Sequence, residues 1–192
     1  MAAPMPMPSS LPDIASLSSL ADSTLGDALD LLFEPTRDLH ALAIPTMRSI
    51  TFTSYPELID TIRDQLLTIQ SAVHSDPTAR QPLLNILGSH PRLGQKKVES
   101  AQSAAEQAQL RSGRAGAGEE DELARVNEEY EERFPGLRYV VFVNGRGRDE
   151  IMRNMRERID RGDVVLEERE AIEAMCDIAK DRARKLQAPV IP

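Results

Sequence analysis

An apolar stripe with helical spacing in the first half of the chain constrains the fold most strongly. Ser54 and Glu57 have the spacing of a capping box, and Pro56 between them is tolerated in a first helical turn. Behind this cap, apolar side chains recur every three or four residues, at Leu58, Ile59, Ile62, Leu66, Ile69 and Val73. Because that spacing places side chains on one face of an α-helix, the pattern predicts a helix over 54–73 with one buried face.

Patterns of the same period predict helices along most of the remaining chain. They cover residues 23–33, 82–87, 98–110, 120–134, 148–159 and 165–186. Aromatic residues make up only 4% of the chain and Trp is absent, so the core must be built from aliphatic side chains. Such a core suits packed helices better than a β-sandwich. We therefore expect an all-α fold, a single-domain bundle of about eight helices.

Three segments depart from this helical pattern. Residues 1–12 are rich in Pro, Met and Ser, which predicts a disordered N-terminal arm ahead of a helical domain over 13–188. Residues 111–120 contain three glycines, which predicts a flexible loop within that domain. Residues 137–143 form an apolar, β-branched run without an obvious partner strand elsewhere in the sequence. We expect this run to be a buried extended segment near 137–143.

Charge and apolar content exclude several classes of protein. The net charge is −8 and the pI is about 5.0, and clustered basic residues are lacking, so we expect no nucleic-acid partner. No run of about 18 apolar residues is present, so we expect no membrane span. The single cysteine, Cys176, cannot form an intramolecular disulfide, which favours an intracellular protein, and its helical surroundings indicate a packing role. We expect a cytoplasmic or peroxisomal location, although residues 189–192 do not form a peroxisomal signal.

The histidines do not have the spacing of a metal site. His40, His74 and His90 are the three histidines of the chain, and no two of them stand four residues apart on one helix. Cys176 has no ligand type close to it in the sequence that would complete a tetrahedral set. We therefore expect no bound metal.

His90 is the first candidate for chemistry. It follows a predicted helix that Gly88 ends, and it precedes Pro91, so its loop has a restricted backbone. A loop of this kind can aim an imidazole into a cleft. The alternative is a surface or structural histidine, which is the commoner role for a histidine in a loop.

Two further polar groups are candidates for a binding pocket. Ser103, Glu106 and Gln107 share one face of a predicted helix, and the residues between them are small. That face either lines a pocket or is solvated. Arg146 and Arg148 follow the apolar run directly, and a planar guanidinium suits the recognition of a carboxylate. The Asn144-Gly145 pair that precedes them is equally typical of a simple turn.

These groups belong to a series of motifs whose order resembles a known family. The motifs are His90-Pro91-Arg92-Leu93-Gly94, Ser103-Ala104-Ala105-Glu106-Gln107, Asn127-Glu128-Glu129-Tyr130 with Phe134-Pro135, and the run from Tyr139 to Arg146, with Phe33-Glu34 as an earlier element. Together they resemble the family of 2-oxo-4-hydroxy-4-carboxy-5-ureidoimidazoline (OHCU) decarboxylases, over about residues 23–186.

The resemblance implies an all-helical fold, usually a homodimer, without a metal or an organic cofactor. The implied reaction is the decarboxylation of OHCU, a small molecule, to (S)-allantoin in urate degradation. It implies that His90 is the general acid or base and that Glu106 interacts with the ring hydroxyl group or with His90. Ser103 and Gln107 would hydrogen-bond the ring amide and ureido groups. The remaining substrate-binding positions implied by the resemblance and the neighbouring sequence are Pro91, Val143, Asn144 and Arg146.

One position departs from the family pattern. Many relatives carry an arginine where this sequence has Asn144. Either Arg146 or Arg148 supplies the positive charge instead, or Asn144 binds by hydrogen bonds alone. We expect Arg146 to face the pocket because it is closer to the apolar run, and Arg148 to begin the next helix.

Two other functions remain open at the level of sequence. The acidic helices and the terminal arm also suit a non-enzymatic helical interaction module. A hydrolase acting on a related ureide, with His90 as its base, is the second alternative. An enzyme requires the polar groups at His90, Ser103, Glu106 and Gln107 to converge on one pocket, whereas a scaffold does not, and release of CO₂ distinguishes a decarboxylase from a hydrolase.

Overall fold

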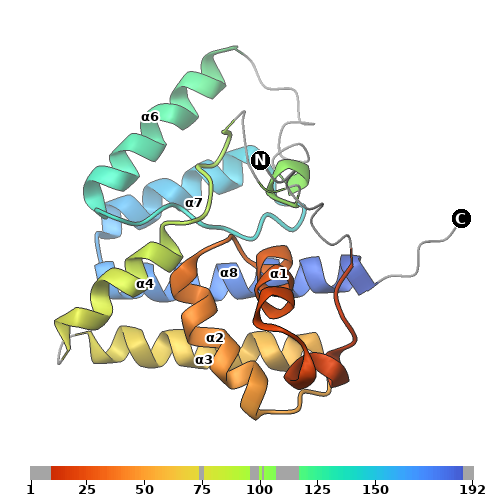
Figure 1. Ribbon diagram of the computed structural model, residues 1–192. Helices are drawn as coiled ribbons and strands as arrows, with labels where there is room; N and C mark the ends of the chain where they lie inside the picture. Colours follow the sequence, from red (N-terminus) through yellow and green to blue (C-terminus); the bar gives the residue numbers. More distant parts are fainter. Residues whose placement is uncertain (1–9, 74–75, 96–99, 101, 107–116, 188–192) are drawn as a thin grey trace, which may run out of the picture.

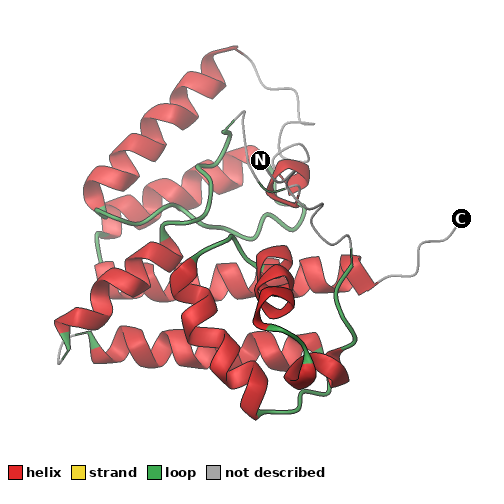
Figure 2. Cartoon of the chain, viewed as in Figure 1, coloured by secondary structure: helices red, strands yellow, loops and turns green. Residues whose placement is uncertain are grey.

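The computed structural model describes residues 10–73, 76–95, 100, 102–106 and 117–187. Within these ranges the chain contains helices and loops but no strand, so the predicted all-α class is confirmed (Figure 2). The elements in chain order are the 3-10 helix η1 (Ile14–Ser19), α1 (Asp22–Leu32), α2 (Arg37–Ser49), α3 (Tyr55–Ala72), η2 (Pro77–Ala79), α4 (Arg80–Leu87), a helical stretch over 102–106, α6 (Ala117–Arg133), α7 (Arg148–Arg161) and α8 (Val164–Gln187).

The longest helix, α8, forms the centre of the bundle (Figure 1). It packs most extensively along α3 and also against α1 and α4, while α6 and α7 pair with each other. Most of its buried face is apolar, with Ile172, Met175 and Ala179 fully inside the core. Glu168 is buried as well, and two further buried charged residues, Glu167 and Arg182, lie near the two ends of the helix. They are fifteen positions apart, which corresponds to about 22 Å of helix.

The helix α3 begins where the capping pattern predicts, with one difference in its hydrogen bonds. The Ser54 hydroxyl oxygen accepts from the Glu57 N–H at 3.3 Å. The Glu57 carboxylate does not return to Ser54 but accepts from the Thr53 N–H at 2.8 Å and the Thr53 hydroxyl at 2.7 Å. The cap therefore fixes one residue more than a reciprocal capping box would. The predicted stripe is buried at Leu58, Ile59, Ile62, Leu66 and Val73, and Ile69 is half-buried.

Several predicted helices begin and end within two residues of the observed bounds. These are α1, α4, α7 and α8. The helix α6 begins at Ala117, so the last four residues of the loop predicted over 111–120 are helical, and the other six lie outside the described residues. Of the helix predicted over 98–110, residues 102–106 are observed as helical and most of the rest lies outside the description.

The helix α2 was not among the sequence predictions. It contains Pro45 in its interior, and a proline there removes one backbone hydrogen bond and normally argues against a helix. Thr36 caps its start, because its hydroxyl oxygen accepts from the Leu39 N–H at 3.2 Å. Leu39, Ala43 and Met47 are buried, so packing against the core stabilises α2 despite the proline.

The run at 137–143 has no regular secondary structure, as the sequence predicts (Figure 2). Leu137, Tyr139 and Val140 are buried and the other residues of the run are half-buried. It ends in a tight turn in which Asn144 and Gly145 both have positive φ, 42° and 78°, and the Arg146 N–H donates to the Val143 carbonyl at 2.8 Å. Asn-Gly is the preferred pair for a turn with two positive φ angles, so the predicted turn is confirmed.

The ends of the predicted domain and the single cysteine complete the comparison with the sequence. Residues 1–9 of the predicted arm lie outside the described residues, while Leu11 packs on the core and the Pro12 carbonyl accepts from the Tyr55 hydroxyl at 2.8 Å. Cys176 is buried in the core, and burial raises the pKa of its thiol to about 12, which agrees with a packing role. None of the described helices combines the length and the apolar character that crossing a bilayer requires.

Candidate active site

The loop that carries His90 is fixed at its start by close backbone packing. Gly88 ends α4, and its N–H donates to the Leu84 carbonyl at 2.7 Å. A Cβ atom at this position would lie 2.6 Å from the Gly136 carbonyl oxygen, so only glycine lets the two segments approach. His90 follows two residues later and is turned inward, with 9% of its surface exposed. The structure therefore gives His90 a buried position, unlike an ordinary loop histidine.

The imidazole of His90 lacks partners among the described residues. Both ring nitrogens are buried, and neither has a hydrogen-bonding partner in the described part of the chain. Burial lowers the pKa of His90 to about 4, although Glu34 and Glu106 nearby act in the opposite direction. At neutral pH the ring is therefore uncharged, with one nitrogen able to donate and the other able to accept. A buried polar group of this kind is costly to leave unpaired, by about 1–3 kcal/mol, and such groups are typical of sites that receive a ligand.

Arg182 organises the polar side chains next to His90. Its guanidinium contacts Glu106 with two bonds, Nε to Oε1 and Nη2 to Oε2, both 2.8 Å long. Nη2 also donates to Glu34 Oε1 at 3.0 Å and to the Ser103 hydroxyl oxygen at 2.9 Å. The Ser103 hydroxyl in turn donates to Glu34. One arginine from α8 thus holds side chains from the end of α1 and from the helical stretch 102–106.

The charges of this group are unequal. One guanidinium faces two carboxylates, so the group of Arg182, Glu34 and Glu106 carries one net negative charge when both glutamates are ionised. Burial alone would raise the pKa of Glu34, but its charge interactions with His90 and Arg182 and its hydrogen bonds with Ser103 and Arg182 together lower it below its ordinary value. Glu34 is therefore held as a carboxylate, and its negative charge faces the His90 ring.

Two adjacent cavities adjoin this group. The inner cavity has a volume of about 40 Å³ and is lined by His90, Pro91, Leu93, Ser103, Glu106, Tyr139, Val140, Val141, Val143 and Ile178. The outer cavity has a volume of about 200 Å³ and is lined by Glu106, Val141, Phe142, Val143, Asn144, Gly145, Ile178, Asp181, Arg184 and Lys185. Glu106 lines both cavities, so a ligand in the outer cavity reaches the same carboxylate that borders His90.

Basic side chains surround the outer cavity. Arg184 and Lys185 both pair with Asp181, and the Lys185 Nζ atom lies 2.5 Å from Asp181 Oδ2. Although partial burial opposes it, the proximity of these two cations lowers the pKa of Asp181. The lining of the outer cavity thus carries two cations, Arg184 and Lys185, and two carboxylates, Asp181 and Glu106.

The structure brings most of the sequence-predicted residues to these cavities. His90, Pro91, Ser103, Glu106 and Val143 line the inner cavity, and Val143 and Asn144 line the outer one. Gln107 lies outside the described residues.

Arg146 and Arg148 are not lining residues of either cavity. The Arg146 guanidinium bends back onto its own segment, where Nη2 donates to the Phe142 carbonyl and Nε donates to the Val143 carbonyl at 3.4 Å. It thereby supports the turn at Asn144, because these carbonyls have no ladder partner. Arg148 begins α7 as the sequence predicts, and it borders a separate cavity of about 240 Å³ next to Leu93 and Asn127.

Sequence reasoning missed the roles of Arg182 and Glu34. A signal for Arg182 was present, since it continues the apolar face of α8 after Ile172, Met175 and Ala179. An arginine at such a position indicates a buried ion pair. Glu34 follows the apolar end of α1, but its partner is 148 positions away and no local pattern connects the two.

Comparison with known proteins shows the family to which this chain belongs. The family model of the OHCU decarboxylases matches residues 18–184. The chain is 28% identical to the uric acid degradation bifunctional protein PucL of Bacillus subtilis, over 75% of this chain and 26% of that protein. It is 31% identical to a 2-oxo-4-hydroxy-4-carboxy-5-ureidoimidazoline decarboxylase of Haloferax volcanii, over 56% of this chain and 62% of that protein. The aligned parts therefore cover less than two thirds of each relative. Because the family model covers nearly the whole described chain, including His90, Ser103 and Glu106, this protein belongs to the OHCU decarboxylase family.

Proposed function

We propose that this protein is a cofactor-independent decarboxylase that converts OHCU to (S)-allantoin in urate degradation. The observation that carries the proposal is the neutral, buried His90, whose two nitrogens have no partner in the described chain and which shares a cavity with Ser103 and Glu106. Membership of the family and the similarity to the decarboxylase of Haloferax volcanii support the same reaction.

The chemistry of the substrate explains why such a site can act without a cofactor. The ring carbon that loses CO₂ carries a hydroxyl group, and the adjacent ring carbon carries the ureido group and a double bond to nitrogen. The electron pair of the broken C–C bond forms a C=C bond between the two ring carbons, the π pair of the C=N bond moves to the ring nitrogen, and this nitrogen takes up a proton. The hydroxyl proton then leaves, and the ureido-bearing carbon gains a proton and becomes the stereocentre. The protein must therefore orient the ring and move protons on one face.

His90 is suited to these proton transfers. Its neutral ring accepts the hydroxyl proton at one nitrogen, and the resulting imidazolium can return a proton to carbon. The nearby carboxylates of Glu34 and Glu106 stabilise that imidazolium, since each of them raises the pKa of His90. The proton that His90 gains during the reaction is thus held in the cavity instead of being lost to solvent, and its delivery to one face gives one enantiomer.

Glu106 and the outer cavity provide for orientation. Arg182 holds both oxygens of Glu106, so this carboxylate has a fixed position from which to accept a hydrogen bond from the ring hydroxyl group. The cations Arg184 and Lys185 in the lining of the outer cavity suit the carboxylate of the substrate before it leaves as CO₂. Asn144, where many relatives have arginine, lines the same cavity and supplies hydrogen bonds there.

The direct test generates the substrate in situ from urate and follows optical activity and CO₂ release, with and without the protein. We expect faster CO₂ release and an excess of (S)-allantoin over the racemate of the uncatalysed reaction. Ring opening without CO₂ release would support the ureide hydrolase instead. A chain that changes neither signal would support the interaction module, although convergence of His90, Ser103 and Glu106 on one cavity favours an enzyme.

We further propose that the enzyme is a homodimer, as the family resemblance implies. Val164, Val165 and Leu166 at the start of α8 expose apolar surface that a second copy of this chain could cover. Sedimentation equilibrium tests this: a mass near twice the chain mass of 21.3 kDa is expected. A mass of one chain at micromolar concentration would contradict it.

A further inference from the structure

The segment 139–143 forms a wall of both cavities. Tyr139, Val140, Val141 and Val143 line the inner cavity together with His90, and residues 141–143 continue along the outer cavity. A displacement of this wall therefore changes the space in which a ring sits between His90 and Glu106. Since reaction geometry is sensitive to displacements of about 1 Å, the position of the wall bears directly on catalysis.

The wall does not belong to a sheet, so other contacts must hold it in place. Within the described chain, residues 137–143 pair with no strand. The Val140 carbonyl instead accepts from Arg158 Nη1 at 3.1 Å. The Tyr139 ring lies under the same guanidinium, with Arg158 Cζ 4.9 Å from the ring centre, and its hydroxyl donates to Asn154 Oδ1 at 2.7 Å. These three contacts come from α7, through Arg158 and Asn154, while Arg146 holds the Phe142 and Val143 carbonyls at the other end of the wall.

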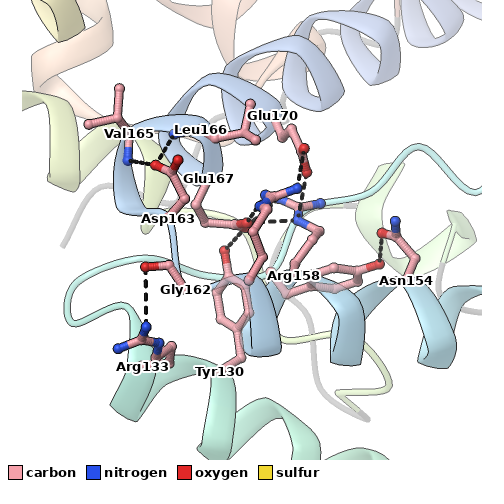
Figure 3. Close-up of polar contacts among 12 residues, drawn as sticks. Tyr130, Arg133, Asn154, Arg158, Gly162, Asp163, Val165, Leu166, Glu167 and Glu170 are labelled. Carbon is pink, nitrogen blue, oxygen red and sulfur yellow. Dashed lines mark hydrogen bonds and ion pairs between the residues drawn. The ribbon is translucent and has the colours of Figure 1, made fainter.

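Arg158 is itself held rigidly by a buried carboxylate (Figure 3). Its Nε donates to Glu167 Oε2 at 2.9 Å, and its Nη2 donates to Glu167 Oε1. Tyr130, which lies on α6, donates its hydroxyl hydrogen to the same carboxylate. Glu167 is fully buried and Arg158 is 4% exposed. Burial alone would lower the pKa of Arg158, but the hydrogen bonds and charge of Glu167 raise it, so the guanidinium stays charged.

Neither Arg158 nor Glu167 is a lining residue of the inner or outer cavity. Any effect of this pair on the reaction is therefore indirect, and the wall is the segment that connects Arg158 with the inner cavity. Resting on the function proposed above, we propose that Arg158 is a positioning residue for the decarboxylase. By fixing the Val140 carbonyl and the Tyr139 ring from the side of α7, it sets the wall of the cavity that His90 lines, and it thereby controls which face of the ring receives the proton.

Replacement of Arg158 by Lys tests the proposal, with Arg161→Lys as the matched control. Lysine at 158 keeps a positive charge for Glu167 but loses the planar group that spans Glu167, the Val140 carbonyl and the Tyr139 ring. Arg161 also pairs with Glu167 and Glu170, at 3.2 and 2.7 Å, and among the described residues it has no hydrogen bond or ion pair to the wall. Both variants thus weaken the ion pairs of Glu167, but only Arg158→Lys also removes contacts to residues 139–143.

We expect Arg158→Lys to lower kcat about tenfold and to reduce the enantiomeric excess of (S)-allantoin, at a temperature where all proteins are folded. Hydrogen exchange of the amides of residues 139–143 should be faster than in the wild type. Arg161→Lys should keep kcat, enantiomeric excess and exchange close to wild type. If Arg158→Lys does not fold, Asn154→Ala, which removes the partner of the Tyr139 hydroxyl, should show the same changes to a smaller degree.

Two outcomes overturn the inference. Arg158→Lys with wild-type kcat and enantiomeric excess would show that the wall does not depend on Arg158. Equal losses in Arg158→Lys and Arg161→Lys would assign the effect to general loosening of the ion-pair group. An inactive wild-type protein would instead overturn the proposed function, and hydrogen exchange would still report whether Arg158 holds residues 139–143.

Discussion

Two buried arginines of this protein have similar partners and different surroundings. Arg158 and Arg182 each contact a glutamate through two nitrogens, and each is nearly inaccessible to solvent. Around Arg158, the neighbouring groups of Glu167, Tyr130 and Val140 are all engaged in hydrogen bonds. Beside Arg182, in contrast, His90 has two unpartnered nitrogens within the described chain and borders a cavity.

The difference between these two regions shows which feature indicates a ligand-binding site. A buried ion pair alone is expected to serve structure or position, because its charges satisfy each other. An unpaired titratable group at a cavity wall indicates a place where a ligand completes the hydrogen bonds. On this criterion we propose the Arg182 region as the reacting region and the Arg158 region as its support through residues 139–143.

The largest expected effect separates the two regions by activity. His90→Asn should lower decarboxylation by about 10²–10⁴-fold, because it removes general acid–base catalysis. The melting temperature should stay nearly unchanged, since the imidazole has no hydrogen bond to lose among the described residues. Initial rates of CO₂ release and thermal unfolding of the same preparation measure both quantities. Wild-type activity in this variant would show that His90 is not catalytic and that the Arg182 region is not distinguished from the Arg158 region by its role in the reaction.

Removal of a carboxylate should separate the regions by stability. Glu167→Ala leaves the Arg158 charge buried without its main partner and should reduce the free energy of unfolding by about 3–5 kcal/mol. Glu106→Ala should have a smaller effect, because Glu106 is partly exposed and Arg182 keeps Glu34 as a partner. Urea unfolding measures both variants. Equal losses would indicate that the Arg182 region is as much a structural cluster as the Arg158 region.

The pH dependence of stability should come from the His90 region. The pKa of His90 is about 4 in the folded protein and about 6.5 in an unfolded chain, so between these values the unfolded chain binds a proton that the folded one does not. Stability should therefore decrease as the pH falls from 6.5 to 4, by up to about 3 kcal/mol. Glu34, whose pKa is lowered on folding, loses its contribution in the same direction as the pH falls further.

Urea unfolding at several pH values checks this expectation, with His90→Asn as the comparison. The variant should lose most of the slope between pH 6.5 and 4 and keep the part that comes from carboxylates. An unchanged slope in the variant would mean that the pKa of His90 is the same in the folded and the unfolded protein, which would contradict the expectation.

The smallest expected effect concerns the arginines after the wall. Arg146 donates to the Phe142 and Val143 carbonyls beside the outer cavity, so Arg146→Lys should weaken substrate use about tenfold, about 1.4 kcal/mol. Arg148→Lys should be nearly silent because Arg148 borders a different cavity. The ratio of kcat/KM values of the two variants measures the difference. A large loss in Arg148→Lys with little change in Arg146→Lys would indicate that the substrate binds next to Arg148.

Local signals explain which parts of the fold could be predicted. The Ser54 cap, the Gly88 helix end and the Asn144-Gly145 turn depend on a few adjacent residues, so sequence patterns located them. The helix α2 was missed because Pro45 opposes a helix locally, and only packing of Leu39, Ala43 and Met47 outweighs it. The guanidinium expected at the cavity from Arg146 was assigned by nearness in sequence, whereas the buried guanidinium of the site comes from α8.

The sequence by itself determined the helical class, the extended segment at 137–143 and the chemistry available at His90, Ser103 and Glu106. Periodicity, caps and motif order contain that information because it is local. Tertiary structure alone decided that Arg182 joins Glu34 to Glu106, and that Arg158 lies against Tyr139 and Val140. The physical reason is that buried charges take partners wherever packing brings them, across 148 positions for Arg182 and Glu34, and this choice depends on the whole core instead of on any one segment.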